Sequence, residues 1–161
     1  MIVPAEQALA FTQEQPQDAG AIEALLDHAF GPGRFTKVSE RVREFAEFRP
    51  EMSFCAWDGG RLVGSVRMWA IHVGGQPAMF LGPLAVLAEA RKFGTGGDLV
   101  QRASAAAQAA GYPVVLVGDE PYFGRFGYSV AAAKDVRLPG PVDQRRVLVL
   151  GASDLAGLVT A

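Results

Sequence analysis

Apolar residues recur at helical spacing near the start of the chain. One such stripe predicts a helix that begins at Pro16–Asp18 and ends before Gly31-Pro32-Gly33. The members of this stripe are Ile22, Leu25, Leu26, Ala29 and Phe30. A second helix is predicted over residues 39–48, because Val42, Phe45, Ala46 and Phe48 are apolar at helical spacing. Arg49-Pro50 ends this helix. A short strand over residues 11–14 precedes both helices.

The middle of the chain changes to runs that are typical of antiparallel strands. Residues 52–57 and 61–73 are separated by the turn Asp58-Gly59-Gly60, and the turn Gly74-Gly75 precedes a third run over residues 77–86. The third run is almost wholly apolar, which predicts a central strand that is buried on both faces.

Gly82 and Pro83 interrupt this third run. Because proline has no N–H to donate to a sheet and glycine weakens a strand, we expect a bulge or a splay there. An alanine-rich helix is predicted over residues 96–110, followed by a short strand of β-branched residues over 113–117. Strand, helix and strand in this order predict a parallel, right-handed crossover.

The fold class predicted from these elements is α+β, with an antiparallel meander joined to one parallel crossover unit. A short helix over residues 121–126 and a late strand over 145–150 complete the pattern. The length of 161 residues fits a single domain over residues 1–161, and the 50% hydrophobic content is enough to bury a core. Four aromatic residues of the helical region could belong either to that core or to a substrate-binding cluster, and we expect the core; they are Phe30, Phe35, Phe45 and Phe48.

The composition narrows the range of partners. A formal net charge of −2 gives no basic surface for nucleic acid or for an anionic membrane. No apolar run reaches transmembrane length, and Met1–Gln7 has neither the basic region nor the apolar stretch of a signal peptide, so we expect a cytoplasmic location. Two histidines and one cysteine do not make a zinc site, and we expect Cys55 to be a buried core residue.

The segment Arg91–Gly97 lies directly before the alanine-rich helix. The first N–H groups of a helix are unpaired and carry partial positive charge, which favours phosphate binding. Gly94 and Gly96 let the backbone approach a ligand closely, and Arg91 and Lys92 add positive charge. The alternative interpretation is a flexible loop that only caps the helix.

Two other nucleotide-binding patterns compete for this loop. A phosphate-binding loop of the Walker type ends in Gly-Lys-Ser/Thr, whereas this segment continues as Gly96-Gly97-Asp98. A dinucleotide-binding fingerprint is favoured by Asp119, which follows the next strand. However, residues 87–93 separate the preceding strand from the glycines, and Leu99 stands where the third glycine belongs.

The segment also matches the pattern Arg/Gln-x-x-Gly-x-Gly/Ala. Before it lies Leu81-Gly82-Pro83-Leu84-Ala85-Val86, and after it lie Val114–Asp119 and Tyr122–Tyr128. These motifs, in this order, resemble the GNAT superfamily of N-acetyltransferases and in particular its small bacterial members with a Leu-Gly-Pro-Leu-Ala-Val strand. The resemblance implies a GNAT-like fold in which acetyl-CoA occupies a V-shaped cleft between the strands that end at Val86 and Val117.

The same resemblance implies how the acyl donor is held. The main chain of Leu84–Val86 pairs with pantetheine, and one N–H there stabilises the oxyanion. The pyrophosphate contacts N–H groups of residues 92–97, with Arg91 at its edge. The implied donor-binding residues are Leu84, Ala85, Val86, Arg91, Lys92, Phe93, Gly94, Thr95, Gly96, Gly97 and Phe123. A small-molecule or peptide amine then attacks the thioester directly, and a homodimer is left open.

The catalytic groups are less regular than the donor-binding motifs. The family's tyrosine acid, four residues before the glycine of Gly-Phe, falls on Phe123, which has no hydroxyl. The adjacent Tyr122 is the candidate acid, but side chains of neighbouring helical residues point about 100° apart, so it can serve only if the turn is rotated; structural packing is its alternative role. Glu120 and Asp119 are candidate bases, with a turn or a helix cap as the alternative role for each.

The absent hydroxyl leaves a second function open. A GNAT-fold protein that binds acyl-CoA with little turnover, as a sensor or a partner-binding subunit, is favoured by Phe123 and by the lack of a clear base. Arg67 and Trp69 share one face of their predicted strand, and either an acceptor pocket or a half-exposed sheet face accounts for them. His72 is expected to be a surface or core histidine.

Overall fold

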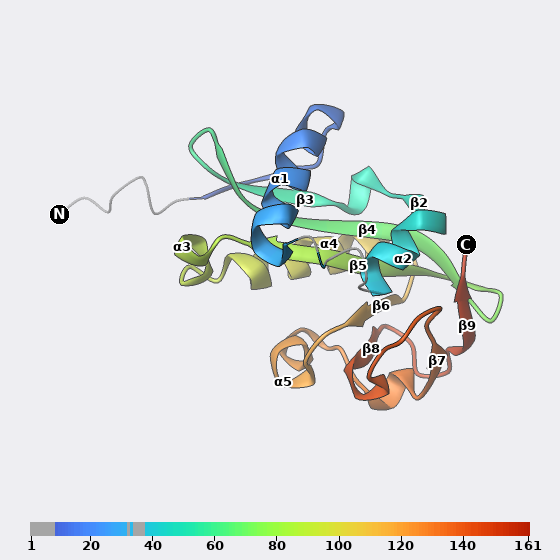
Figure 1. Ribbon diagram of the computed structural model, residues 1–161. Coiled ribbons are helices and arrows are strands. Elements are labelled where there is room, and N and C mark those ends of the chain that lie inside the picture. The colour runs from blue at the N-terminus through green and yellow to red at the C-terminus, as the bar shows by residue number, and fades with distance from the viewer. Residues whose placement is uncertain (1–8, 32, 34–37) are drawn as a thin grey trace.

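The computed structural model describes residues 9–31, 33 and 38–161 (Figure 1). The strands are β1 (Ala10–Gln13), β2 (Glu47–Phe48), β3 (Phe54–Asp58), β4 (Arg61–Val73), β5 (Gln76–Val86), β6 (Val114–Val117), β7 (Asp135–Arg137), β8 (Val147–Leu150) and β9 (Ala156–Thr160). The helices are α1 (Ala19–Phe30), α2 (Val38–Phe45), α3 (Ala88–Arg91), α4 (Thr95–Ala109) and α5 (Glu120–Phe123).

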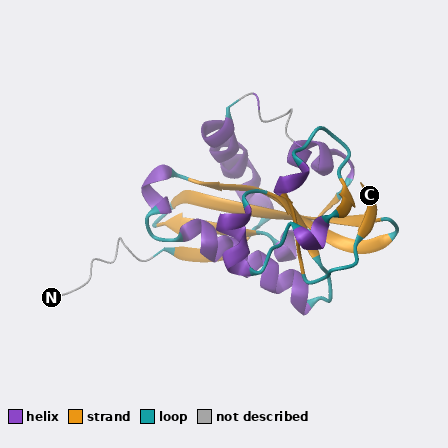
Figure 2. Ribbon diagram, turned by 90° about the horizontal axis from the view of Figure 1, so that it is seen from below, coloured by secondary structure: helices purple, strands orange, loops and turns teal. Residues whose placement is uncertain are grey.

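A mixed, mainly antiparallel sheet forms the centre of the molecule. Its main path runs β1-β3-β4-β5-β6-β8, while β2 and β9 each pair with β4. The pairs β5–β6 and β7–β9 are parallel, and the other pairs are antiparallel. Helices α1 and α2 cover one face of the sheet and α4 covers the other (Figure 2). The predicted α+β class and its parallel strand–helix–strand unit are confirmed.

The parallel strands β5 and β6 pair over a short stretch and then separate. Met79 lies opposite Val114 and Phe80 opposite Val115, whereas both strands continue beyond these pairs. On the other side of β5, Val66 faces Leu84.

The next pair on that side joins Met68 to Leu81, so β5 carries one extra residue around Gly82 and Pro83. This confirms the predicted bulge. The indole Nε1 of Trp69 donates a hydrogen bond of 2.7 Å to the carbonyl oxygen of Gly82 and holds the bulge against β4.

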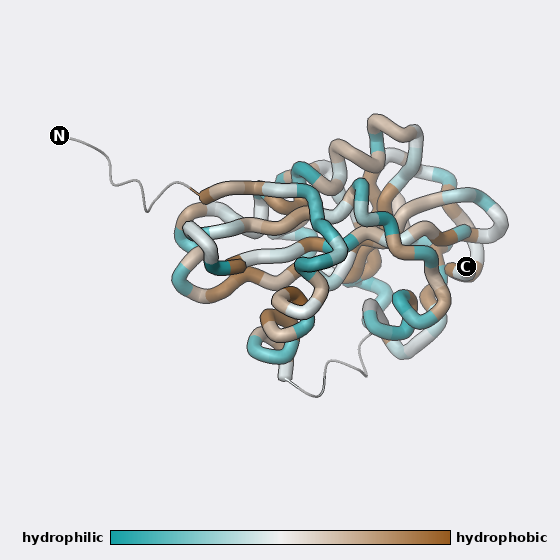
Figure 3. Tube along the Cα trace, turned by 90° about the horizontal axis from the view of Figure 1, so that it is seen from above, coloured by the Kyte–Doolittle hydropathy of each residue, from teal (hydrophilic) through white to brown (hydrophobic). Residues whose placement is uncertain are grey.

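The core lies along the central strands. Strongly hydrophobic positions follow these strands and the inner sides of the helices, whereas hydrophilic positions gather at turns and helix ends (Figure 3). The residues from Ala78 to Pro83 of β5 are all buried, as predicted for a strand covered on both faces. Cys55 is fully buried, and burial, followed by the nearby Asp18 carboxylate, raises the pKa of its thiol to about 12. The expected core role of this cysteine is confirmed.

Several predicted elements differ from the structure. The helix expected to reach residue 48 ends at Phe45, and Glu47–Phe48 pairs with β4 instead. The reason is a tertiary contact, because the Phe48 ring lies 5.0 Å from that of Trp69. The expected core position is wrong for Phe30 and Phe45, which are 36% and 38% exposed. Phe35 lies outside the described residues.

Arg67 was not expected to be buried, but it is only 4% exposed. Its guanidinium donates to both carboxylate oxygens of Glu14, at 3.1 and 3.2 Å, and to Glu23 at 3.2 Å. These two carboxylates come from the chain just after β1 and from α1. Two alternatives were left open for Arg67 and Trp69, an acceptor pocket or a half-exposed sheet face. The sheet face is wrong because both side chains are buried, at 4% and 6% exposure, and neither lines the two cavities described below. Two carboxylates compensate the buried charge of Arg67.

Candidate active site

Two cavities meet where β5 and β6 separate. The first, the α4 cavity, has a volume of about 680 Å³. Its lining comes from the ends of α1 and β5, from α3 with the following loop, from the first turns of α4 and from α5. The lining residues are Ala29, Phe30, Leu84, Ala85, Val86, Arg91, Lys92, Gly94, Gly96, Gly97, Asp98, Gln101, Tyr122, Arg125 and Phe126. Eight of the predicted donor-binding residues are thus brought together in one cavity.

The start of α4 supplies backbone N–H groups to this cavity. Gly94 precedes the helix with φ +73°, a conformation that favours glycine. The N–H of Phe93 donates to Ala90 O and that of Gly94 to Arg91 O, so neither is available for a ligand. The first helical N–H groups, from Thr95 to Gly97, have no acceptor within the helix. The N–H groups that remain available to a ligand therefore span a narrower range than the expected residues 92–97.

The side chains of residues 91–95 add positive charge to the cavity and hydrogen bonds that hold the loop in place. Arg91 lines the cavity, and its Nε donates a hydrogen bond of 3.1 Å to Val86 O, which fastens the loop to β5. Lys92 also lines the cavity and places its Nζ 5.2 Å from the centre of the Phe93 ring. Phe93 itself is 42% exposed and does not line the cavity. Thr95 is buried, and its hydroxyl donates to Ala90 O at 2.8 Å.

Helix α5 directs Tyr122 and Phe123 to different surroundings. A Cβ added to Gly96 would lie 3.0 Å from the Tyr122 hydroxyl oxygen, which places that hydroxyl over the start of α4. The Phe123 ring lies against Gly118, where an added Cβ would come within 2.3 Å of it. Tyr122 lines both cavities and Phe123 only the second. The turn is thus oriented so that Tyr122 carries the hydroxyl at the site.

Tyr128 occupies the aromatic position of the Gly-Phe motif but turns its hydroxyl away from the cavities. Its oxygen lies 2.7 Å from Ser104 Oγ, and the side chain is 2% exposed. Burial raises the pKa of this tyrosine, while the hydrogen bond to Ser104 partly opposes the increase. Tyr128 is therefore a structural residue that joins α4 to the segment after α5.

The second cavity, the β6 cavity, has a volume of about 630 Å³. It lies along the gap between β5 and β6 and shares Phe30, Leu84 and Tyr122 with the α4 cavity. Its remaining lining residues are Glu40, Phe80, Leu81, Gly82, Pro83, Leu116, Val117, Gly118, Asp119, Phe123, Pro141, Val142, Asp143 and Arg146.

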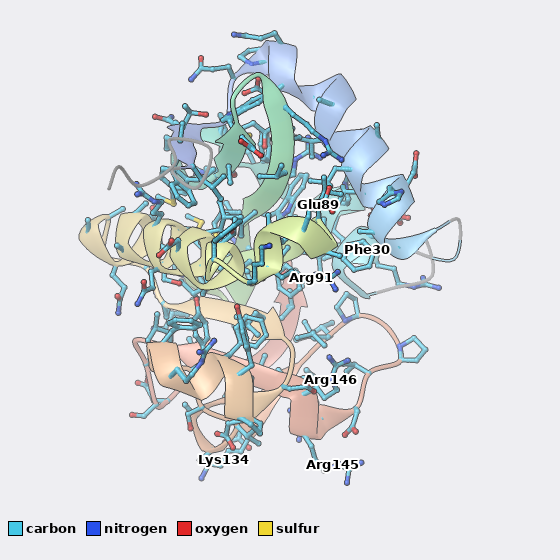
Figure 4. The ribbon with its side chains drawn as sticks, turned by 90° about the vertical axis from the view of Figure 1, so that its left-hand side faces the viewer. Phe30, Glu89, Arg91, Lys134, Arg145 and Arg146 are labelled. Atoms are coloured by element: carbon cyan, nitrogen blue, oxygen red, sulfur yellow. The ribbon has the colours of Figure 1, made fainter. Side chains whose placement is uncertain are left out.

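The two cavities face the same side of the molecule. Figure 4 looks onto this side, with Phe30 and Arg91 near the ends of α1 and α3 and Arg146 on the opposite side of the opening, just before β8. A ligand that extends from α4 toward β6 therefore passes between Phe30, Leu84 and Tyr122, the residues that both cavities share.

The candidate bases are placed differently from one another. Glu120 is exposed, lines neither cavity and accepts a hydrogen bond of 2.9 Å from Val130 N, which fits the turn role that was left open for it. Asp119 lines the β6 cavity and accepts from Arg146 Nε at 3.1 Å. His72 is exposed and lines neither cavity.

Glu40 lines the β6 cavity and was missed in the sequence. It is 5% exposed and accepts from Arg43 at 3.1 and 3.4 Å. The Glu40–Arg43 spacing on one helix is a visible signal for an ion pair. No local pattern indicates that α2 faces the gap between β5 and β6, because that placement depends on tertiary packing.

Within the described part of the chain, three or more His, Cys, Asp or Glu side chains do not gather where they would hold a metal ion. None of the helices in that part has the length and hydrophobicity that crossing a bilayer requires. The expected cytoplasmic location stays a prediction.

Known proteins are similar to this chain in sequence and in fold. The sequence model of the acetyltransferase (GNAT) family matches residues 21–127. The chain is 32% identical over 131 residues to the N-acetyltransferase YhbS of Escherichia coli K12, which covers 80% of this chain and 78% of that protein.

Two crystal structures extend the comparison. YhbS from Escherichia coli in complex with CoA has a TM-score of 0.79 at 28% identity, over 99% of this chain and 92% of that one. A GNAT family acetyltransferase from Brucella melitensis in complex with acetyl-CoA has a TM-score of 0.70 at 24% identity, over 96% of both chains, and supports the fold. The match of family model, curated relative and fold shows that this chain belongs to the GNAT family of acetyltransferases.

Proposed function

We propose that the chain is an acetyl-CoA-dependent N-acetyltransferase, organised as a single domain over residues 1–161. The observation that carries this proposal is the α4 cavity, in which the end of β5 and the start of α4 face one another. The crystal structure of Escherichia coli YhbS with CoA, at 28% identity, supports the assignment of this cavity to the acyl donor.

The donor is held by backbone groups at both ends of the α4 cavity. The main chain of Leu84–Val86 lies on the side of β5 that β6 leaves unpaired, so pantetheine can add to it like a strand. The pyrophosphate contacts the N–H groups of Thr95–Gly97, where the helix dipole favours negative charge. The guanidinium of Arg91 and the ammonium of Lys92 add charge-assisted contacts at the rim.

The acceptor enters from the β6 cavity and meets the thioester between Phe30, Leu84 and Tyr122. A neutral amine nitrogen forms a bond to the thioester carbon, and a main-chain N–H near Leu84 stabilises the oxyanion. The carbon–sulfur bond then breaks and CoA leaves as a thiolate, while the nitrogen, which became positively charged on attack, loses one proton to water and gives the neutral amide. We assign the protonation of that sulfur to the Tyr122 hydroxyl, because Tyr122 lines both cavities.

The alternative function, acyl-CoA binding with little turnover, is favoured by the lack of an available hydroxyl at two aromatic positions. Phe123 has no hydroxyl, and the Tyr128 hydroxyl is buried against Ser104. A protein that binds acyl-CoA and transfers the acyl group slowly, as a sensor or partner-binding subunit, would retain the α4 cavity but would not need an acid there.

One assay separates the two functions. The purified protein is incubated with acetyl-CoA and a panel of primary amines, with free CoA thiol measured over time and acetylated products identified by mass. We expect amine-dependent CoA release. A thermal shift with acetyl-CoA but no product from any small-molecule or peptide amine would contradict the acetyltransferase proposal and support the binding function.

A further inference from the structure

The β6 cavity has apolar walls and one deeply buried charged side chain. Phe80, Leu81, Pro83 and Leu116 line it from β5 and β6. Among the described lining residues, Glu40 is the charged side chain that is more than nine-tenths buried, since its side chain is only 6% exposed. Its carboxylate is compensated by Arg43, so a paired negative charge is kept beside the otherwise apolar wall of this cavity.

Glu40 is held in place by a chain of ion pairs. Arg43 donates to Glu40 at 3.1 Å and to Glu23 of α1 at 2.6 Å. Glu23 also accepts from Arg67 of β4 at 3.2 Å, and Arg67 is in turn paired with Glu14. The carboxylate is therefore fixed relative to both α1 and the sheet, which a group that positions a substrate requires.

The other charged lining residues lie across the cavity and are more exposed. Asp119 follows β6 and is paired with Arg146, and their side chains are 72% and 49% exposed. Asp143 is paired with Arg145, which is 88% exposed and lies far from Phe30 in Figure 4. These groups form a solvated rim, whereas Glu40 lies on the α2 side within the cavity.

We propose that Glu40 binds the ammonium group of the acceptor and accepts its proton, so that the substrates are aliphatic primary amines with an apolar body. This inference rests on the proposed function. Alkyl amines are almost fully protonated at neutral pH, as lysine is with a pKa of about 10.4, and a proton must leave before attack. The N–H bond breaks, the proton passes to a Glu40 oxygen directly or through one water, and the nitrogen lone pair attacks the thioester carbon. After the attack the nitrogen loses a second proton to water, which gives the neutral amide, and the proton on Glu40 also returns to water.

The test compares two kinds of acceptor in the wild type and in Glu40→Gln. Benzylamine is a cation at pH 7, whereas aniline has a similar apolar body and is neutral. Glutamine keeps the size of the side chain and an oxygen for Arg43. We expect kcat/KM for benzylamine to fall about a hundredfold or more in the variant, as for loss of a general base. We expect kcat/KM for aniline to stay within about twofold of wild type.

Controls separate this role from a structural one. Glu44→Gln changes an exposed carboxylate on the same helix that lines neither cavity, and it should leave both substrates unaffected. Glu40→Asp keeps the charge and should recover part of the benzylamine activity. The Glu40→Gln deficit should also shrink as pH rises toward the amine pKa. The Glu40→Gln variant leaves unchanged the described charged and titratable groups of the ion-pair chain and of the cavity lining, namely Arg43, Glu23, Arg67, Asp119, Asp143, Arg146 and Tyr122.

Each outcome decides the proposal. Equal losses for benzylamine and aniline would overturn it, because a distorted cavity would affect both acceptors. Wild-type protein that acetylates aniline but no aliphatic amine would overturn the Glu40 assignment and leave the acetyltransferase function intact. Wild-type protein that acetylates neither class, while acetyl-CoA still raises its melting temperature, would contradict the proposed function and Glu40's role together.

Discussion

Gly96→Asp tests the donor site at the start of α4. A Cβ at this position would lie 3.0 Å from the Tyr122 hydroxyl oxygen and 3.7 Å from Val86 Cγ2. Both contacts are with the far ends of side chains, so small movements relieve them. A carboxylate in the first turn of a helix is itself favourable by about 0.3–1 kcal/mol. The variant is therefore expected to fold, while its negative charge occupies the place proposed for the pyrophosphate.

The size of the effect follows from ligand linkage. Acetyl-CoA at about a hundred times its Kd stabilises the wild-type protein by about 2.7 kcal/mol. For a domain of this size, about 2–4 °C of melting temperature corresponds to each kcal/mol, so the expected shift is about 5–11 °C. Thermal melts with and without acetyl-CoA should show this shift for the wild type and lose it in Gly96→Asp.

Gly20→Asp is the matched control. Gly20 is an exposed position of α1 with open space around it, so the control adds the same charge far from the α4 cavity. It should keep the full shift. A Gly96→Asp protein that retains the wild-type shift would refute the assignment of the pyrophosphate to this helix start.

Three further substitutions test separate parts of the molecule. Arg91→Ala should weaken acetyl-CoA binding about tenfold at low salt and less at high salt, measured by calorimetry at two ionic strengths; equal affinities would make Arg91 a solvated loop residue. Tyr122→Phe should lower kcat about a hundredfold and Phe123→Tyr should change it little, and the reverse result would assign the acid to position 123. Arg67→Met should cost about 3–5 kcal/mol in urea unfolding, whereas the exposed Arg61→Met on the same strand should cost under about 1 kcal/mol; similar small losses would show that the buried ion pair is unimportant.

The grouping of eight predicted residues around the α4 cavity was predictable because the segments that carry them are close together in the sequence. The strand end at Leu84–Val86, the loop Arg91–Gly94 and the start of α4 occupy one continuous segment, and each part has its own local signal. The bulge at Gly82 and Pro83 was predictable for the same reason, since both residues disfavour regular pairing. The structure adds the narrower range of free N–H groups, which depends on hydrogen bonds inside the loop.

Features that depend on distant contacts were not predictable. Arg67 is separated by 53 and 44 residues from the two glutamates that neutralise it, so its burial leaves no local pattern. The strand β9 is defined by its pairing with β4 and β7, and its contact with β4 joins distant parts of the chain and leaves no local pattern. Phe48 was assigned to a helix because its spacing continued the stripe, but packing against Trp69 draws it into a strand.

The candidate acid on α5 shows that counting residues along the sequence does not identify which side chain faces the cavities. Counting back from Gly127 selects Phe123, but in the structure this ring fills the space over Gly118 and forms the wall of the β6 cavity. The preceding residue then points into both cavities, because neighbouring positions of a short helix diverge by about 100°. A glycine at 118 leaves room for the Phe123 ring, because a Cβ there would come within 2.3 Å of it. Tyr122 at the junction of the two cavities is thus a consequence of how Phe123 packs, and a counted spacing alone does not contain that information.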